Sequence, residues 1–204
     1  MLMQKFKNLI TKINNQVECY KNRQQLKSTG FTIISNNCWG GNIYQKFGLK
    51  YTTPTIGLFI LGHDFVKFCS DLEGYLKKEL EFIRWEESSY YYELKNNAPY
   101  PVARLGDVEI YFMHYKTEEE AREKWNRRLK RVNPEHILFK LSQRDYCSKE
   151  DIEKFMELPI ESKICFAYER VDGVVYVPEL KGLVGDEFAI VSKYIDEISI
   201  LNHL

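Results

Sequence analysis

The chain has 204 residues, of which 44% are hydrophobic and 28% charged, with only 11 glycines and 6 prolines. This composition is typical of a folded globular protein and excludes a disordered or fibrous chain. The 29 basic residues are balanced by 29 acidic residues. A net charge of zero argues against a nucleic-acid partner, which requires a contiguous basic face.

The five cysteines form no Cys-x-x-Cys pair and have no histidine at zinc-finger spacing. The sequence therefore indicates neither a structural zinc site nor a disulfide framework. The longest apolar run, residues 56–61, is far shorter than the about 20 residues that cross a bilayer. Polar residues interrupt the first apolar positions, so no signal peptide is recognisable. We expect a cytoplasmic location, with peripheral membrane contact as an alternative.

The N-terminal segment has the pattern of an amphipathic helix. From Leu2 to Ile13, apolar residues recur at helical spacing and lysines occupy the other positions. We therefore assign residues 1–28 to this helix and residues 29–204 to a single α/β domain of one or two lobes. A basic amphipathic helix can contact an anionic membrane, here through residues 1–14, but the same pattern describes a helix packed on a core.

Beyond Gly30 the chain alternates between strand-like and helix-like segments. We expect a strand at residues 31–34, a helix at about 41–47, a strand at 55–61 and a helix capped by Asp64 that runs to about residue 80. This alternation predicts an α/β fold with a largely parallel sheet flanked by helices. Residues 56–61 are apolar on both faces, which predicts a central strand.

Two tight turns predict antiparallel hairpins added to that sheet. Gly106-Asp107 separates strand-like residues 100–105 and 108–115, and Asp172-Gly173 lies between 164–168 and 174–177. The sheet is therefore expected to be mixed. The remaining elements are a helix that begins after Thr117, a strand at residues 137–141, a helix capped by Ser148 and a helical segment at 188–204.

The turn after the first strand is a candidate ligand site. In open α/β sheets, ligands bind beyond the carboxyl ends of the parallel strands, and a glycine-rich turn before a helix can hold an anion. The candidate ligand-binding residues there are Ser35, Asn36, Asn37, Trp39, Gly40 and Gly41. The alternative interpretation is structural: the polar side chains cap the helix, the glycines supply backbone freedom and Trp39 is core.

A second candidate turn follows the strand at residues 137–141. Ser142 and Arg144 are candidate ligand-binding residues, because a guanidinium group can bind a phosphate or carboxylate through two hydrogen bonds. Asp145 is a candidate catalytic base. The alternative is that Arg144 and Asp145 pair with each other or with their neighbours.

His114 is the second candidate catalytic residue. Alternation along residues 108–113 places His114 on the apolar face of its strand, where a histidine is often a core residue, although it is the one histidine whose position resembles a site. Lys116 follows it as a candidate ligand-binding residue. Arg127, Arg128 and Arg131 form a basic stripe on the next helix, which suits either an anionic ligand or a solvated helix end.

Motifs along most of the chain resemble those of a known family. The segments concerned are Ser35-Asn-Asn-Cys-Trp-Gly-Gly41, Thr53-Pro-Thr55, Tyr100-Pro-Val102, Leu105-Gly-Asp107, Phe112-Met-His-Tyr-Lys116, Trp125-x-Arg-Arg128, Ser142-Gln-Arg-Asp145 and Pro178-Glu-Leu180. They are similar to those of a bacterial family of unknown function commonly labelled exopolysaccharide or capsular polysaccharide biosynthesis protein. The resemblance implies an α/β protein of surface-polysaccharide biosynthesis. It brings no established catalytic residues.

Together these features lead us to expect a transferase that binds an anionic small molecule such as a sugar phosphate or nucleotide sugar. In this interpretation the two turns and the basic stripe hold the anion, and His114 or Asp145 transfers the proton. The alternative is a non-catalytic assembly protein that docks on a partner or membrane surface. The sequence specifies no cofactor, no metal ligands and no oligomeric state.

Overall fold

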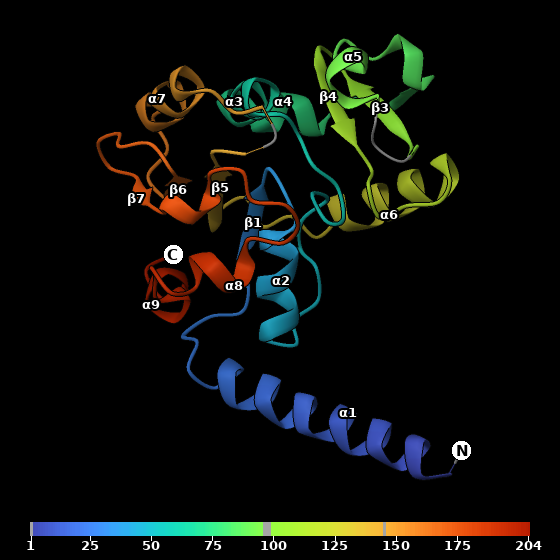
Figure 1. The fold of residues 1–204 in the computed structure, drawn as a ribbon, viewed down its shortest axis with the longest axis vertical. Coiled ribbons are helices and arrows are strands. Elements are labelled where there is room, and N and C mark those ends of the chain that lie inside the picture. The colour runs from blue at the N-terminus through green and yellow to red at the C-terminus, as the bar shows by residue number, and fades with distance from the viewer. Residues whose placement is uncertain (1, 96–98, 145) are drawn as a thin grey trace.

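A parallel sheet forms the centre of the fold. The computed structural model describes residues 2–95, 99–144 and 146–204, but not the side chains of residues 2, 4 and 5. The sheet contains β1 (Thr32–Ser35), β5 (Ile137–Ser142), β6 (Lys163–Ala167) and β7 (Val175–Tyr176). These four strands are all parallel and lie in the order β1-β5-β6-β7 (Figure 1). The predicted α/β fold with a largely parallel sheet is confirmed.

A separate antiparallel sheet carries the predicted first hairpin. It consists of β2 (Glu81–Ile83), β3 (Val102–Leu105) and β4 (Val108–Tyr111), in the order β2-β3-β4. β3 and β4 pair from Val102 with Tyr111 to Leu105 with Val108. Gly106 has φ +68° in the connecting turn, a conformation that glycine adopts without steric cost. The hairpin thus forms as predicted, but in a sheet of its own.

The helices cover both faces of the parallel sheet. They are α2 (Trp39–Lys46), α3 (Gly62–Ser70), α4 (Leu72–Leu76), α5 (Tyr91–Leu94), α6 (Glu118–Leu129), α7 (Lys149–Glu157), α8 (Phe188–Val191) and α9 (Glu197–Leu201), with short 3-10 turns at Trp85–Glu87 and Pro178–Leu180. Figure 1 shows α3 and α7 on one side of the sheet, and α2, α8 and α9 on the other. The predicted caps form: Thr117 accepts from the backbone of Glu120, and Ser148 and Asp151 make a capping box.

Alternate residues of the strands supply the two apolar layers. Ile33 of β1 and Leu138 of β5 belong to one buried cluster with Trp39, whereas Ile34 and Leu141 belong to the other. This is the arrangement expected for a parallel sheet whose two faces are both buried. Lys140 lies on the same face as Leu138 and is completely buried.

The prediction of a central strand at residues 55–61 is wrong. The segment is buried, but among the described residues its only β-pairing is an isolated antiparallel bridge from Phe59 to Tyr111. Gly57 has φ +71°, which interrupts an extended strand. The segment instead spans the two sheets, since the backbone N–H of Ile60 donates to Asn36 O and Phe59 pairs with β4. Burial on both sides reflects this position and does not indicate a sheet strand.

The second predicted hairpin is also wrong, because β6 and β7 are parallel. Phe166 pairs with Val175 and Ala167 with Tyr176, and the backbone N–H of Val177 donates to Ala167 O. Gly173 has the positive φ of a turn residue, +78°. The chain nevertheless crosses over before β7, so that β7 extends the parallel sheet. A turn signal identifies a change of direction but leaves the pairing open.

Two helix predictions are corrected at their ends. The helix expected from Asp64 to about residue 80 divides into α3 and α4 at Asp71, which has φ −142° and caps α4 through the backbone N–H of Gly74. Asp64 lies inside α3, where its carboxylate accepts from the backbone of Glu109. The C-terminal helical segment divides in the same way into α8 and α9.

The N-terminal helix α1 (Leu2–Arg23) confirms the predicted amphipathic helix and extends well beyond Ile13. Figure 1 shows that it projects away from the rest of the molecule, with its C-terminal end near α2. Among the residues that the structure describes, no helix combines the length and the apolar character that a bilayer crossing requires.

Candidate functional site

The two turns singled out in the sequence lie side by side. β1 and β5 are neighbouring parallel strands, so their carboxyl ends meet at one edge of the sheet. Asn36 joins the turns, because its Oδ1 accepts from the backbone N–H of Ser142 at 3.1 Å and its Nδ2 donates to Ser142 O at 3.4 Å. The side chain of Asn36 is fully buried and serves to hold the two turns together.

A buried ion pair lies directly beneath these turns. The Nζ of Lys140, from β5, donates to Oε1 of Glu187, the residue before α8, and both side chains are almost completely buried. Ser142 Oγ donates to the same carboxylate oxygen at 2.7 Å. A guanidinium nitrogen of Arg144 lies 3.5 Å from the other oxygen. Two cations and one hydroxyl group therefore surround one carboxylate.

This environment keeps Glu187 ionised. Burial alone would raise the pKa of Glu187, but Lys140, Ser142 and Arg144 together hold that pKa below its ordinary value. Glu187 is therefore the carboxylate partner of both Lys140 and Arg144.

Asn37 presents an amide N–H₂ group that has no acceptor among the described residues. Asn37 is 8% exposed, and its Nδ2 is buried without a hydrogen-bond partner. Its Oδ1 accepts from Lys140 Nζ at 2.8 Å and from the backbone N–H of Trp39 at 3.2 Å. Because both of these partners are donors, the amide cannot be reversed without losing both bonds. The orientation of Nδ2 as an unused donor is thus fixed.

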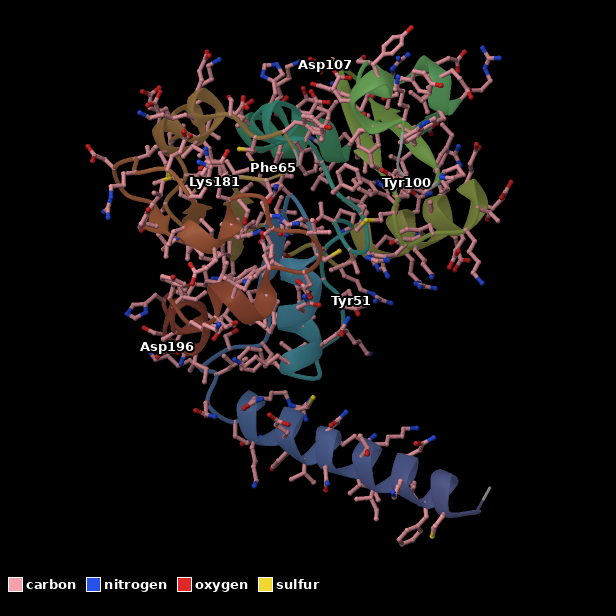
Figure 2. The ribbon with its side chains drawn as sticks, in the orientation of Figure 1. Tyr51, Phe65, Tyr100, Asp107, Lys181 and Asp196 are labelled. Carbon is pink, nitrogen blue, oxygen red and sulfur yellow. The ribbon has the colours of Figure 1, made fainter. Side chains whose placement is uncertain are left out.

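An open cleft of about 990 Å³ adjoins this group. Its wall includes residues from the β1 turn, from Arg144 and Tyr146 after β5, from the loop before α8, from α5 and from the segments that flank β3 and β4. The lining residues are Asn37, Cys38, Asn42, Phe59, Glu93, Leu94, Tyr100, Met113, His114, Arg144, Tyr146 and 183–187. Tyr100, which Figure 2 labels, lies in the chain that leads into β3. The cleft combines aromatic surface with a few polar groups, as small-molecule sites generally do.

His114 lines the cleft rather than the core. β4 ends at Tyr111, and the backbone N–H of His114 then donates to Gly57 O. This turn directs the side chain to solvent, where it is exposed. The expectation that His114 shares the apolar strand face is wrong for this reason, whereas its candidacy as a site residue gains from its place in the cleft.

The other candidates from the first turn lie beneath the site and support it without lining the cleft. Trp39 is buried and packs on Phe166 at 5.7 Å between ring centroids. Ser35 is buried, and its Oγ accepts from the backbone N–H of Asn37. A Cβ atom on Gly40 would lie 3.0 Å from Ile33 Cγ2, so glycine permits the close approach of α2 to β1. Gly41 faces Ile56 with more room.

The basic stripe does not line the cleft. Arg127 pairs with Glu123 at 2.9 Å. Arg128 is buried and donates to Tyr115 Oη and Ile56 O, and Arg131 donates to Tyr51 O. Lys116 lies before α6, and it too is not among the cleft residues. Asp145 lies outside the described residues.

The sequence analysis missed Lys140 and Glu187. Lys140 had a usable signal, since it is the one charged residue within the otherwise apolar run Leu138–Leu141. Glu187 had none, because it lies 47 positions further along the chain in a loop. In the described ranges no cluster of three or more histidine, cysteine, aspartate or glutamate side chains is arranged to hold a metal ion.

Fold and site together define an α/β protein with an open cleft at the carboxyl edge of its parallel sheet. Residues 8–204 match the family described as a domain of unknown function, DUF1919, and the chain belongs to this family. The chain is also similar to an uncharacterised protein of Haemophilus influenzae. The two are 30% identical over 194 residues, which cover 91% of this chain and 89% of the relative.

Proposed function

We propose that the cleft binds a phosphorylated sugar, as a sugar phosphate or a nucleotide sugar, and that the protein is a transferase. One observation carries this proposal: Asn37, whose Nδ2 is a buried donor of fixed orientation with no acceptor among the described residues, lines the same cleft as Arg144. An unused buried donor costs about 1–3 kcal/mol, a cost that a bound acceptor would remove.

The phosphate would lie at the edge of the parallel sheet. Arg144, whose guanidinium group already contacts Glu187 and donates to Leu183 O, would direct its remaining N–H groups to a phosphate oxygen, and Asn37 would offer a further hydrogen bond. Asn37 and Cys38 immediately precede α2, so the positive end of the helix dipole is directed to the same place.

The sugar would lie against the opposite wall. Phe59 and Tyr100 pack edge to face at 5.8 Å and line the cleft, which provides an apolar surface for a sugar ring. Glu93, from α5, also lines the cleft and can accept hydrogen bonds from sugar hydroxyl groups.

His114 would act as the general base of a glycosyl transfer. In that step an acceptor hydroxyl oxygen attacks the anomeric carbon, the bond from that carbon to the phosphate oxygen breaks and the phosphate leaves with the electron pair. The proton of the hydroxyl group passes to an imidazole nitrogen of His114. Asp145, the other candidate from the sequence, remains a proposal for the same role.

The surface-polysaccharide setting rests on the family resemblance of the motifs in residues 35–180. Exopolysaccharide or capsule assembly consumes phosphorylated sugar donors, which agrees with the ligand proposed for the cleft. A cytoplasmic location is proposed on the same basis, together with the cysteine pattern of the sequence.

Isothermal titration calorimetry of the full chain with sugar phosphates, nucleotide sugars and the unphosphorylated sugars tests the proposal. We expect a phosphorylated sugar to bind and Arg144→Gln to weaken that binding by about tenfold or more. Arg127→Gln is the matched control, because it removes the same charge from an exposed residue outside the cleft. Thermal unfolding verifies that each variant is folded. Equal affinities of the two variants, or no binding of any phosphorylated sugar, would refute the proposal.

A further inference from the structure

One face of α1 is an exposed apolar stripe. At about 100° per residue, its members fall within an arc of about 120°. The residues of this stripe are Met3, Phe6, Leu9, Ile10, Ile13, Val17 and Tyr20. Phe6 is 63% exposed and Met3 77%, values far from those of a helix packed on a core. A continuous apolar surface of this extent marks an interaction site.

The helix is attached to the rest of the protein through its opposite, polar face. Cys19 Sγ donates to Gln45 O at 3.2 Å, and Asn22 Nδ2 donates to Lys46 O at 3.3 Å. At about 100° per residue these two positions lie on the side of the helix away from the stripe. The contacts with α2 therefore turn the apolar stripe outward, away from the body of the molecule.

The charges of α1 identify the surface that the stripe fits. Residues 6–23 contain four basic side chains, Lys7, Lys12, Lys21 and Arg23, but only one acidic side chain, Glu18. At about 100° per residue, Lys7 and Lys21 lie within about 40° of one border of the stripe and Arg23 lies about 40° beyond the other, whereas Lys12 and Glu18 both lie about 60° beyond a border, toward the polar face. A second copy of this helix would bring like charges together, and an acidic surface with an apolar interior would complement both features.

We propose that α1 lies flat in the headgroup region of an anionic phospholipid bilayer, with the stripe inserted among the acyl chains. Lys7 and Lys21, at one edge of the stripe, would then contact lipid phosphates while the polar face stays in water. Because the protein attaches to α1 through that polar face, the α/β domain would remain on the aqueous side. This docking is independent of the ligand bound in the cleft.

Vesicle co-sedimentation of the full chain tests this docking. The two vesicle types are phosphatidylcholine alone and phosphatidylcholine mixed with phosphatidylglycerol. We expect binding to the anionic vesicles that weakens as salt is added. The variant Ile10→Ser with Ile13→Ser should bind these vesicles with an affinity lower by about tenfold or more, because two inserted side chains are lost. The variant Thr11→Ser with Asn15→Ser is the control on the polar face and should bind as the unaltered chain does.

Three results would overturn the proposal. One is equal vesicle binding by the stripe variant and the control, and another is no binding to either vesicle type. The third is a dimer in analytical ultracentrifugation that the stripe variant abolishes, which would assign the stripe to a second copy. Arg144→Gln should bind vesicles normally, so a failure of the cleft proposal and a failure of the docking proposal give different patterns.

Discussion

Lys140 Nζ donates a hydrogen bond of 2.8 Å to Asn37 Oδ1 and so connects the middle of β5 to the turn after β1. This bond fixes which side of the Asn37 amide faces the protein and leaves Nδ2 as the donor for the cleft. Lys140 is itself held by Glu187 in the buried interior. The buried pair of Lys140 and Glu187 therefore also orients the side chain of Asn37, which we propose binds the ligand.

Removing Lys140 should destabilise the protein strongly. Lys140→Met would leave the buried carboxylate of Glu187 with Arg144 as its remaining cation, at 3.5 Å. Breaking a buried pair in this way costs about 3–5 kcal/mol of the free energy of unfolding. Urea denaturation of the variant measures this loss. A cost below about 1 kcal/mol would show that the pair is not structurally important.

The double variant Lys140→Met with Glu187→Gln separates the two contributions. Glutamine keeps an acceptor for Ser142 Oγ but carries no charge that needs compensation. The double variant should therefore lose less stability than the sum of the two single variants. Strict additivity in urea denaturation would contradict the coupling of Lys140 and Glu187.

Glu109 should contribute to a loss of stability in acid. Burial alone would raise the pKa of Glu109, but the backbone N–H of Ser89 and the hydroxyl groups of Ser88 and Tyr111 lower it below its ordinary value. An acid of this kind stabilises the fold above its unfolded pKa, about 4.3, and loses that contribution as the pH falls through its folded pKa. We expect the free energy of unfolding to fall as the pH drops below about 4.

Glu109→Gln measures this contribution directly. The variant should be less stable than the unaltered chain at pH 7 and should lose less stability between pH 7 and pH 3 in urea denaturation. Burial raises the pKa of neighbouring Asp64, an effect of opposite sign that is present in both proteins. Glu153→Gln, at an exposed position of α7, is the control. An acid loss in Glu109→Gln as large as in the unaltered chain would contradict the assignment.

Two adjacent glycines of α2 should respond in opposite ways to alanine. A Cβ on Gly40 would lie 3.0 Å from Ile33 Cγ2 and 3.1 Å from Ser35 Cβ, whereas a Cβ on Gly41 would meet Ile56 at 3.7 Å. Gly40→Ala should cost about 1–3 kcal/mol through this overpacking. Gly41→Ala should be neutral or stabilise by up to about 1 kcal/mol, because alanine favours a helix. Thermal unfolding compares the two, and a reversed order would contradict the packing of α2 on β1.

The arginines of α6 should differ in the same type of test. Arg128→Met removes donors to Ile56 O and Tyr115 Oη in a buried position and should cost about 1–3 kcal/mol. Arg127→Met removes an exposed pair with Glu123 and should change stability by about 0.5 kcal/mol or less. Equal costs in urea denaturation would contradict a structural role for Arg128.

Local signals explain which parts of the fold could be predicted. The caps at Thr117 and Ser148 and the Gly106-Asp107 turn depend on a few neighbouring residues, and all three form as expected. The rule that ligands bind beyond the carboxyl ends of parallel strands selects the turns after β1 and β5. These two strands are neighbours in the sheet, and Asn37 and Arg144 therefore line one cleft.

Features that depend on distant contacts could not be predicted. Residues 55–61 have the composition of a core strand but bridge two sheets, which only the position of β4 determines. The direction of β7 is set by its pairing with β6 and not by Asp172-Gly173. Likewise, Arg128 resembles a surface cation in the helical pattern but is buried against Tyr115, a contact between separate elements.

The most direct test of the central claim is the side-chain amide signal of Asn37 in a two-dimensional ¹⁵N–¹H NMR spectrum, assigned with Asn37→Asp. On addition of a phosphorylated sugar, this signal should shift because Nδ2 gains an acceptor. The signal of Asn36, whose Nδ2 already donates to Ser142 O, should move far less. A phosphorylated sugar that binds while the Asn37 signal stays unchanged, or that shifts neither signal at saturating concentration, would contradict the account.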